Sequence, residues 1–353
     1  MVSDIFSWRC RSVHVLATLT PLLFFVLFCT SNTDPTMESS SSVSSTSVSS
    51  TADTTEEGPY YYVELSTGGA SFYTTINGVP YFHTTSAGGA FKASPVNVDL
   101  VGSENKLHIV AGPTTEPDSM EPTTPEEARL TGSIKLYQSE DLFGTEDGKT
   151  IETFTLQDTI EARREEKRQS FLNRMEEAPP EEKKELVGRE EELTSVEFPI
   201  EMTVRFDSPK TPSFAGRLTE APVIEDTAAL KDYAIKLRNL MRLQDSRGLY
   251  EELKVKNRDY NKAYYDSDGY EWWRDNFEKY YASGLRTDFE REEIGLRPLL
   301  GGQLWKMYIE DGEPDQPWNP TGRKFFKTRG ENGSILSMRV IVGRVDGELC
   351  IVR

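Results

Sequence analysis

The N-terminal part of this 353-residue chain has a composition that no globular core can use, and this limits the fold more than any other feature. Residues 13–31 form a largely apolar stretch, with Arg9 and Arg11 before it. Such a stretch is typical of an export signal or a membrane anchor. The Ser/Thr-rich run Ser39–Thr55 that follows is typical of a flexible spacer, because it has little apolar surface to bury. Folding is therefore expected in the remaining ~300 residues, which suffice for two domains.

We expect residues 1–31 to be a signal peptide or membrane anchor and residues 32–58 to be a disordered tether. The residues after Cys29, from Thr30 to Asp34, resemble the tether of bacterial lipoproteins, which implies cleavage before Cys29 and acylation of its thiol. Phe28 departs from that family's pattern, which has a small residue at this position. Two alternatives stay open: cleavage after Ser31, or an uncleaved segment near the ~20 residues that a spanning helix needs. All three place the rest of the chain outside the cytoplasm, in the periplasm or on the outer surface.

The charge of the chain and its few cysteines and histidines limit the partners and cofactors that we expect. The formal net charge is −18 and the sequence pI is about 4.8, so no basic face for nucleic acid is expected. Cys350 is the one cysteine beyond the N-terminal segment, which leaves no intramolecular disulfide framework. His83 and His108, on predicted strands without paired cysteines, do not make a zinc site. We expect neither a metal nor another cofactor.

Short runs of β-forming residues separated by turn signals dominate residues 59–209. The runs Tyr60–Leu65 and Ala70–Ile76 precede Asn77-Gly78, a dipeptide that favours a two-residue hairpin turn. Strands this short and closely spaced predict an antiparallel β-sandwich. The segment from Asn77 to Val110 resembles the jelly-roll or immunoglobulin-like accessory modules of exported bacterial proteins. Further strands are expected over Val79–His83, Val96–Leu100, Lys106–Ala111, Leu130–Tyr137, Thr150–Leu156 and Val196–Phe206.

A strongly helix-forming segment, residues 158–193, interrupts this β pattern. Pro179-Pro180 divides it, because proline is tolerated at a helix start and breaks a helix interior. We expect a helical hairpin, with one helix to about Glu177 and a second from Pro180, inserted between two strands. It is either a docking surface for a partner protein or a solvated helical pair that leans on its own sandwich and is stabilised by Glu–Arg and Glu–Lys pairs.

Residues 222–353 predict a second domain, after a proline-containing boundary at Ser208–Pro222. Asp226 or Thr227 can cap the first of its helices. Helices are predicted over Ala228–Leu243, Leu249–Tyr265 and Gly269–Ser283, and strands over Gln303–Ile309, Arg323–Thr328, Ser337–Val345 and Glu348–Val352. Helices followed by a curved antiparallel sheet make an α+β domain. This order, with the closing hairpin at Asp346-Gly347, resembles the NTF2-like fold.

An aromatic concentration in residues 260–281 is the strongest candidate for a ligand site. Aromatic rings offer apolar area with a polar edge, and those not needed for the core can line a pocket for a sugar or another ligand. Core packing alone is the alternative. The candidate ligand-binding residues are Trp272, Trp273, Asp266, Asp268, Arg274 and Asp275.

No catalytic constellation is evident in the sequence, since no GxSxG motif accompanies the two histidines. The leading hypothesis is a non-enzymatic, membrane-tethered, extracytoplasmic protein that binds a protein or a saccharide. The alternative is a hydrolase or isomerase in the C-terminal domain, with Asp266, Asp268 or Asp275 as general base. A third hypothesis is an assembly protein whose hairpin 158–193 holds a partner.

Overall fold

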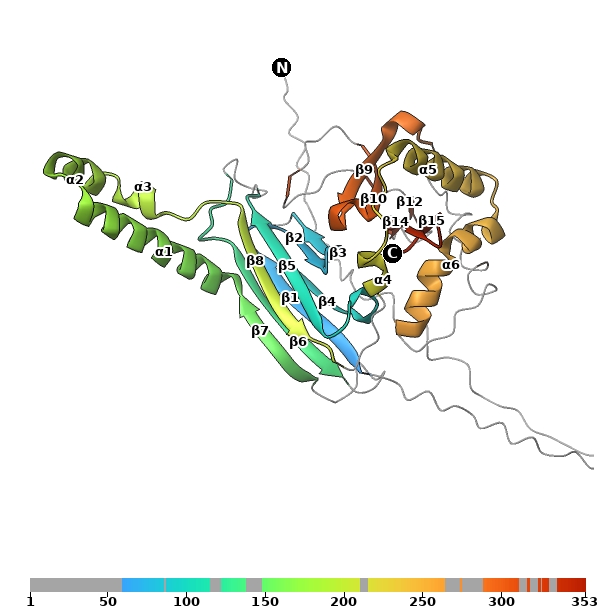
Figure 1. Ribbon diagram of the computed structural model, residues 1–353, viewed down its shortest axis with the longest axis horizontal. Coiled ribbons are helices and arrows are strands. Elements are labelled where there is room, and N and C mark those ends of the chain that lie inside the picture. Colours follow the sequence, from blue (N-terminus) through green and yellow to red (C-terminus); the bar gives the residue numbers. More distant parts are fainter. Residues whose placement is uncertain are drawn as a thin grey trace, which may run out of the picture. The chain divides into compact units, whose positions relative to one another are not determined.

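The computed structural model shows a mixed α+β protein with antiparallel sheets (Figure 1). Residues 55–353 group into one compact unit. The structure describes residues 59–85, 87–114, 122–137, 148–209, 215–263, 274, 288–310, 316–317, 323–324, 326–329 and 335–353.

Two four-stranded antiparallel sheets form from the first half of this unit. The first has the order β4-β1-β6-β7, with β1 at Tyr60–Gly68, β4 at Ala90–Pro95, β6 at Arg129–Tyr137 and β7 at Lys149–Thr155. The second has the order β3-β2-β5-β8, with β2 at Ser71–Ile76, β3 at Val79–Thr84, β5 at Glu104–Gly112 and β8 at Ile200–Asp207.

One hydrophobic core lies between these sheets, because alternate residues of both point into it. Burying each large apolar side chain contributes roughly 1.5–3 kcal/mol relative to leaving it in water. The large strand residues of this core that have no exposed area include Val63, Leu65, Phe72, Ile76, Leu107, Ile109, Leu130, Ile134 and Ile200.

The hairpin turn predicted at Asn77-Gly78 is confirmed: it joins β2 to β3 with positive φ at both residues, 49° and 79°. The strand predicted over Val96–Leu100 is wrong. This segment contains the 3-10 helix η1, Asn97–Asp99. The Asn97 side chain accepts a hydrogen bond from the Tyr61 backbone N–H and donates one to the Pro59 carbonyl, which replaces the ladder of a strand.

The helical insertion begins as predicted and ends differently. Helix α1, Leu156–Glu177, starts where the Thr155 hydroxyl accepts a hydrogen bond from the Asp158 N–H. Helix α2, Pro180–Val187, has proline at its first turn and stops at Gly188. The prediction that a single second helix continues to Leu193 is therefore wrong. A separate short helix, α3 at Glu190–Thr194, follows, and the chain then returns to β8.

The second half of the unit contains helices and one larger sheet. After α4, Gly216–Thr219, come the long helices α5, Thr227–Arg242, and α6, Ser246–Ala263. The Asp226 side chain caps α5, as predicted. The sheet has the order β11-β10-β14-β15, with β9 also on β10. Its strands are β9 at Ile294–Leu299, β10 at Leu304–Ile309, β11 at Arg323–Lys324, β14 at Val340–Val345 and β15 at Glu348–Ile351.

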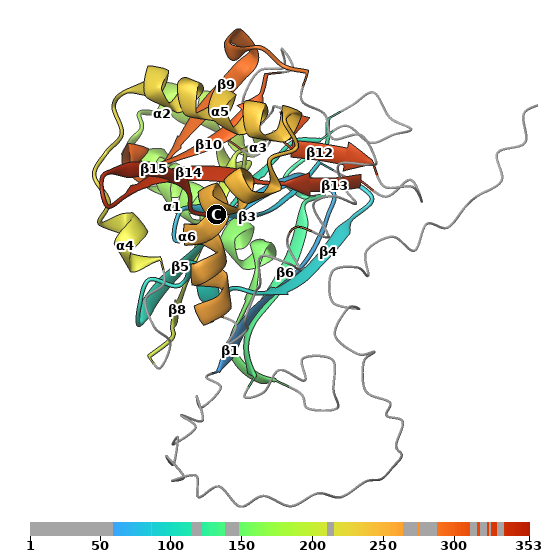
Figure 2. The same ribbon diagram turned by 90° about the vertical axis from the view of Figure 1, so that its right-hand side faces the viewer.

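Helices α5 and α6 pack on this sheet through a second hydrophobic cluster (Figure 2). The cluster joins Leu230 and Leu237 of α5 to Val340 and Val342 of β14. Smaller elements complete this half: the 3-10 helices η2, Arg291–Glu293, and η3, Leu300–Gly302, and the paired strands β12, Phe326–Arg329, and β13, Ile335–Met338.

Sequence reasoning located most of these elements and missed two strands. The hairpin predicted at Asp346-Gly347 is confirmed and joins β14 to β15. Strands β4 and β9 were not predicted. Among the described strands β9 pairs with β10 alone, and it contains Pro298, which an edge strand tolerates. The third helix predicted, Gly269–Ser283, lies almost wholly outside the described residues.

A third hydrophobic cluster joins the two halves of the unit. It brings Val79 of β3 together with Leu218 of α4, Leu304 of β10 and Ile341 of β14. Part of the predicted boundary Ser208–Pro222 therefore packs in this cluster instead of forming an exposed connection.

Candidate functional site

The aromatic site predicted from the sequence lies almost wholly outside the described residues. Of its six candidate residues, Arg274 alone is described, and its side chain is half-buried. The other five, Trp272, Trp273, Asp266, Asp268 and Asp275, stay a prediction. The proposed lipidation residue, Cys29, also lies outside the described part.

Each of the two histidines of the β-rich half has a neighbour of its own. His108 of β5 places its Nε2 atom 3.6 Å from a Glu201 carboxylate oxygen, and both side chains are exposed. The exposed His83 of β3 contacts the Tyr73 ring edge-on, with ring centroids 6.3 Å apart. Across the described ranges, no three His, Cys, Asp or Glu side chains are grouped so that they could hold a metal ion.

A buried charge cluster, which the sequence reasoning missed, centres on Arg353. Its Nε atom is 3.0 Å from Asp99 of η1, and Nη1 is 3.1 Å from Asp259 of α6. Nη2 donates to the Val98 carbonyl at 2.5 Å. The Arg353 and Asp259 side chains are only 2% and 5% exposed, so water screens this pairing little.

Burial sets the electrostatics of this cluster. Loss of hydration raises the pKa of Asp99, and it outweighs the opposing effect of the Arg353 guanidinium. Both carboxylates are bound by one guanidinium, so neither is free to act as a general base. The cluster therefore joins η1 to α6 and to the end of the last strand. A sequence signal did exist, since Asp99 follows Val98 and precedes Leu100, and Arg353 follows Ile351 and Val352.

The helical hairpin, α1 to α3, is largely exposed and has few buried side chains. Leu156 and Ile160, at the start of α1, belong to the core between the sheets. From there to its end at Glu177, α1 has one buried side chain, Phe171. Figure 1 shows the far part of α1 and all of α2 extending beyond the sheets.

Hydrogen bonds from basic side chains hold the base of this hairpin in place. The Lys167 ammonium donates to the Ser195 carbonyl at 2.5 Å, and Arg163 donates to the backbone carbonyls of Pro199 and Glu201 at 3.3 and 3.0 Å. Long basic side chains of α1 therefore hold the returning chain against the helix. This gives the exposed part a defined direction relative to the sheets.

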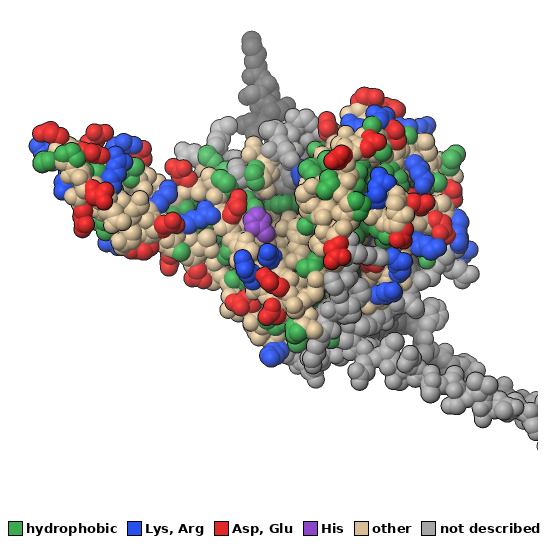
Figure 3. Space-filling view, in the orientation of Figure 1, with side chains coloured by type: hydrophobic (Ala, Val, Ile, Leu, Met, Phe, Trp, Pro, Cys, Tyr) green, Lys and Arg blue, Asp and Glu red, His purple; other side chains and the backbone are tan. Residues whose placement is uncertain are grey.

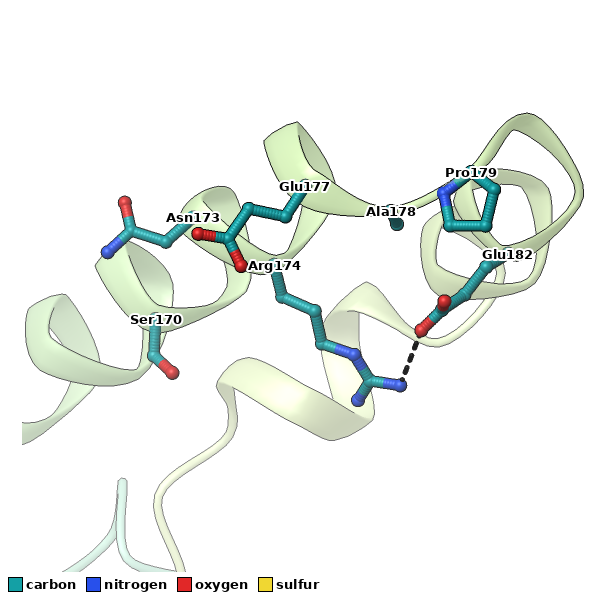
Figure 4. Close-up of a pocket in the computed structure, with 7 residues that line it drawn as sticks. All are labelled: Ser170, Asn173, Arg174, Glu177, Ala178, Pro179 and Glu182. Atoms are coloured by element: carbon teal, nitrogen blue, oxygen red, sulfur yellow. Dashed lines mark hydrogen bonds and ion pairs between the residues drawn. The ribbon is translucent and has the colours of Figure 1, made fainter.

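The tip of the hairpin, residues 171–192, carries apolar and acidic groups together. Leu172 and Val187 are 41% and 59% exposed. Arg174 forms an ion pair with Glu182 at 2.9 Å across an open hollow between α1 and α2 (Figure 4). Charged side chains of both signs cover the surface around it (Figure 3). Six further carboxylates of the tip have no ion pair within the described ranges: Glu176, Glu177, Glu181, Glu185, Glu190 and Glu191.

Comparison with known proteins gives no assignment: no family model, curated protein or solved structure matches this chain. Over the described ranges, no helix has both the length and the apolar composition needed to cross a membrane.

Proposed function

We propose that this chain is a non-enzymatic, membrane-tethered, extracytoplasmic protein that binds a partner protein through its helical hairpin. The observation that carries the proposal is the exposure of α1 to α3. A solvated hairpin that leaned on its own sandwich would bury one face along its length, whereas here the sheets cover only the first turns of α1. An ordered surface that projects from a rigid base suits recognition of another macromolecule.

The architecture suits a scaffold that holds the hairpin exposed for a partner protein. We propose that residues 59–209 form a β-sandwich domain with the hairpin inserted, and that residues 222–353 form an NTF2-like α+β domain. The shared core of the two four-stranded sheets supports the first assignment. The helices α5 and α6 on an antiparallel sheet support the second. Neither fold implies an enzymatic activity, since both occur in inert scaffolds.

The location rests on the sequence. The apolar segment 13–31 and the Ser/Thr-rich run that follows support export and tethering. A tether of this composition would allow the acidic folded part to stay at a distance from anionic lipid.

Deletion of the hairpin tests the proposal. Strands β7 and β8 approach each other, so a short Gly/Ser linker can replace residues 158–193. We expect the shortened protein to keep its near-UV circular dichroism and to lose a crosslinked complex that the full chain forms in native membranes. A matched variant that keeps α1 to α3 and replaces Leu172 and Val187 by serine separates the apolar contacts from the length of the hairpin. An unchanged complex after the deletion would refute the proposal.

A further inference from the structure

Positive charge gathers where the two halves of the unit meet. Arg353 joins Asp99 of η1 to Asp259 of α6, which lies one helical turn after Lys256, and both Arg339 and Lys92 contact Tyr81 of β3. Asp99 and Lys256 each interact electrostatically with Arg339 and Arg353, and Lys92 does so with Arg339. The group contains four cations and two carboxylates, a formal charge of 4 − 2 = +2 on a chain of net charge −18. Its members are Lys92, Lys256, Arg339, Arg353, Asp99 and Asp259.

The carboxylates of this group are already occupied. Arg353 binds Asp99 with Nε and Asp259 with Nη1, so the two negative charges face one guanidinium. Among the described residues, Lys92, Lys256 and Arg339 have no carboxylate within ion-pair distance. The excess positive charge therefore resides on these three side chains.

Both ammonium groups contact aromatic rings instead. The Lys92 Nζ atom is 5.8 Å from the centroid of the Tyr81 ring, and the Lys256 Nζ atom is 5.6 Å from that of Tyr260. A ring face attracts a cation but accepts none of the ammonium's three hydrogen bonds in the way an oxygen does. Each lysine thus keeps donors available on a half-buried side chain.

Arg339 lies beside the same tyrosine. Its guanidinium donates to the backbone carbonyls of Pro80 and Tyr81, which fixes its position on β3. Lys92 lies over the Tyr81 ring, so Arg339 and Lys92 both contact the same residue. Arg339 as a whole is exposed, which leaves the group open to solvent.

Burial and the neighbouring arginines lower the pKa of both lysines. Burial, together with the charges of Arg339 and Arg353, lowers the pKa of Lys256 to about 8. Burial and Arg339 also lower the pKa of Lys92. An anion placed among the three side chains would relieve the repulsion between these cations.

We propose that Lys92, Lys256 and Arg339 form a binding site for a tetrahedral oxyanion, a phosphate or sulfate group. The charge matches, because a phosphate group carries about −1.5 to −2 at neutral pH and the six-residue group has a formal charge of +2. The chemistry matches as well: a guanidinium and two ammonium groups supply charge-assisted hydrogen bonds to the oxygens of such an anion. The site goes beyond the hairpin proposal and does not depend on it.

Isothermal titration calorimetry of the full chain with inorganic phosphate and with inorganic sulfate, at constant ionic strength, tests the site. We expect saturable binding to the parent protein. Lys256→Met and Lys92→Met should each weaken it at least tenfold, while Lys106→Met, at an exposed lysine of β5, should leave it unchanged. Unfolding curves followed by circular dichroism check that the variants are folded, and Arg339→Lys provides a milder change at the third position.

The dependence on pH gives a second measurement. Lys256 loses its proton near pH 8, so phosphate affinity of the parent protein should fall above that pH, and Lys256→Met should lose much of this dependence. Titration with glycerol 3-phosphate distinguishes the source of the group: tighter binding than inorganic phosphate assigns the site to an organic ester, and weaker binding assigns it to the free ion. Absence of saturable binding by all three anions, or equal binding by the parent protein and both lysine variants, would overturn the proposal.

Discussion

Replacement of Arg353 by methionine tests how the halves of the folded unit are joined. Methionine keeps much of the apolar stem and removes the guanidinium. The change leaves the Asp99 and Asp259 carboxylates and the Val98 carbonyl without their shared donor. Removing one partner of a buried ion pair costs about 3–5 kcal/mol. That is a large part of the ~5–15 kcal/mol by which a folded domain exceeds its unfolded state.

Urea unfolding, followed by tryptophan fluorescence, measures the loss. Arg344→Met is the matched control, because its guanidinium donates to the Gly347 carbonyl in an exposed turn, at 2.6 Å. The control should change the free energy of unfolding by less than ~0.5 kcal/mol. Adding Asp99→Asn and Asp259→Asn to Arg353→Met should restore most of the lost stability, because no buried charge then lacks a partner.

The dependence on pH sharpens this test. Burial already raises the pKa of Asp99 above its ordinary 3.8, so the folded state binds this proton more strongly than the unfolded state. The stabilisation from that proton is present at acid pH and is lost as pH rises through the folded-state pKa. Without Arg353, the folded-state pKa of Asp99 should rise further. The loss of unfolding free energy caused by Arg353→Met should therefore become smaller as the pH is lowered. A deficit below ~1 kcal/mol at pH 7, or one that does not change with pH, would contradict this account.

Three further outcomes follow from particular residues. Leu65→Ala, at a fully buried position between the sheets, should lower the free energy of unfolding by about 2–5 kcal/mol, and a loss under ~1 would contradict the shared core. Gly78→Ala should destabilise more than Gly347→Ala in thermal unfolding: both have positive φ, but only the first places a Cβ 2.5 Å from Leu300. Metabolic labelling with a fatty acid should mark the parent chain and not Cys29→Ala if the lipoprotein resemblance holds, and equal label in both, or no label in the parent chain, would contradict acylation at this thiol.

Local chemistry explains which elements could be located from the sequence. Asn77-Gly78 and Asp346-Gly347 adopt positive φ at every residue, so these dipeptides specify their turns without help from distant contacts. The start of α2 at Pro180 is likewise a local property of proline. These predictions are confirmed because the deciding interactions are only a few residues apart.

Distant contacts explain the failures. The segment Val96–Leu100 has the composition of a strand, yet Asn97 bonds to Tyr61, 36 residues away, and the backbone turns into η1. The cluster around Arg353 depends on Asp99, 254 residues before it in the chain. No spacing rule connects two charged residues at such a separation, so the sequence could suggest only that each was unusual among its apolar neighbours.

The sequence by itself determined the mixed α+β character, most strands and helices, and the division of the chain into an apolar N-terminal segment, a polar run and a folded remainder. Each of these follows from composition or from periodicity over a few residues. The tertiary structure alone decided that a carboxylate of η1, a carboxylate of α6 and Arg353 meet in one buried cluster, and that three further cations gather beside them. Charges are brought together by the packing of whole elements, and that packing depends on every side chain in the core.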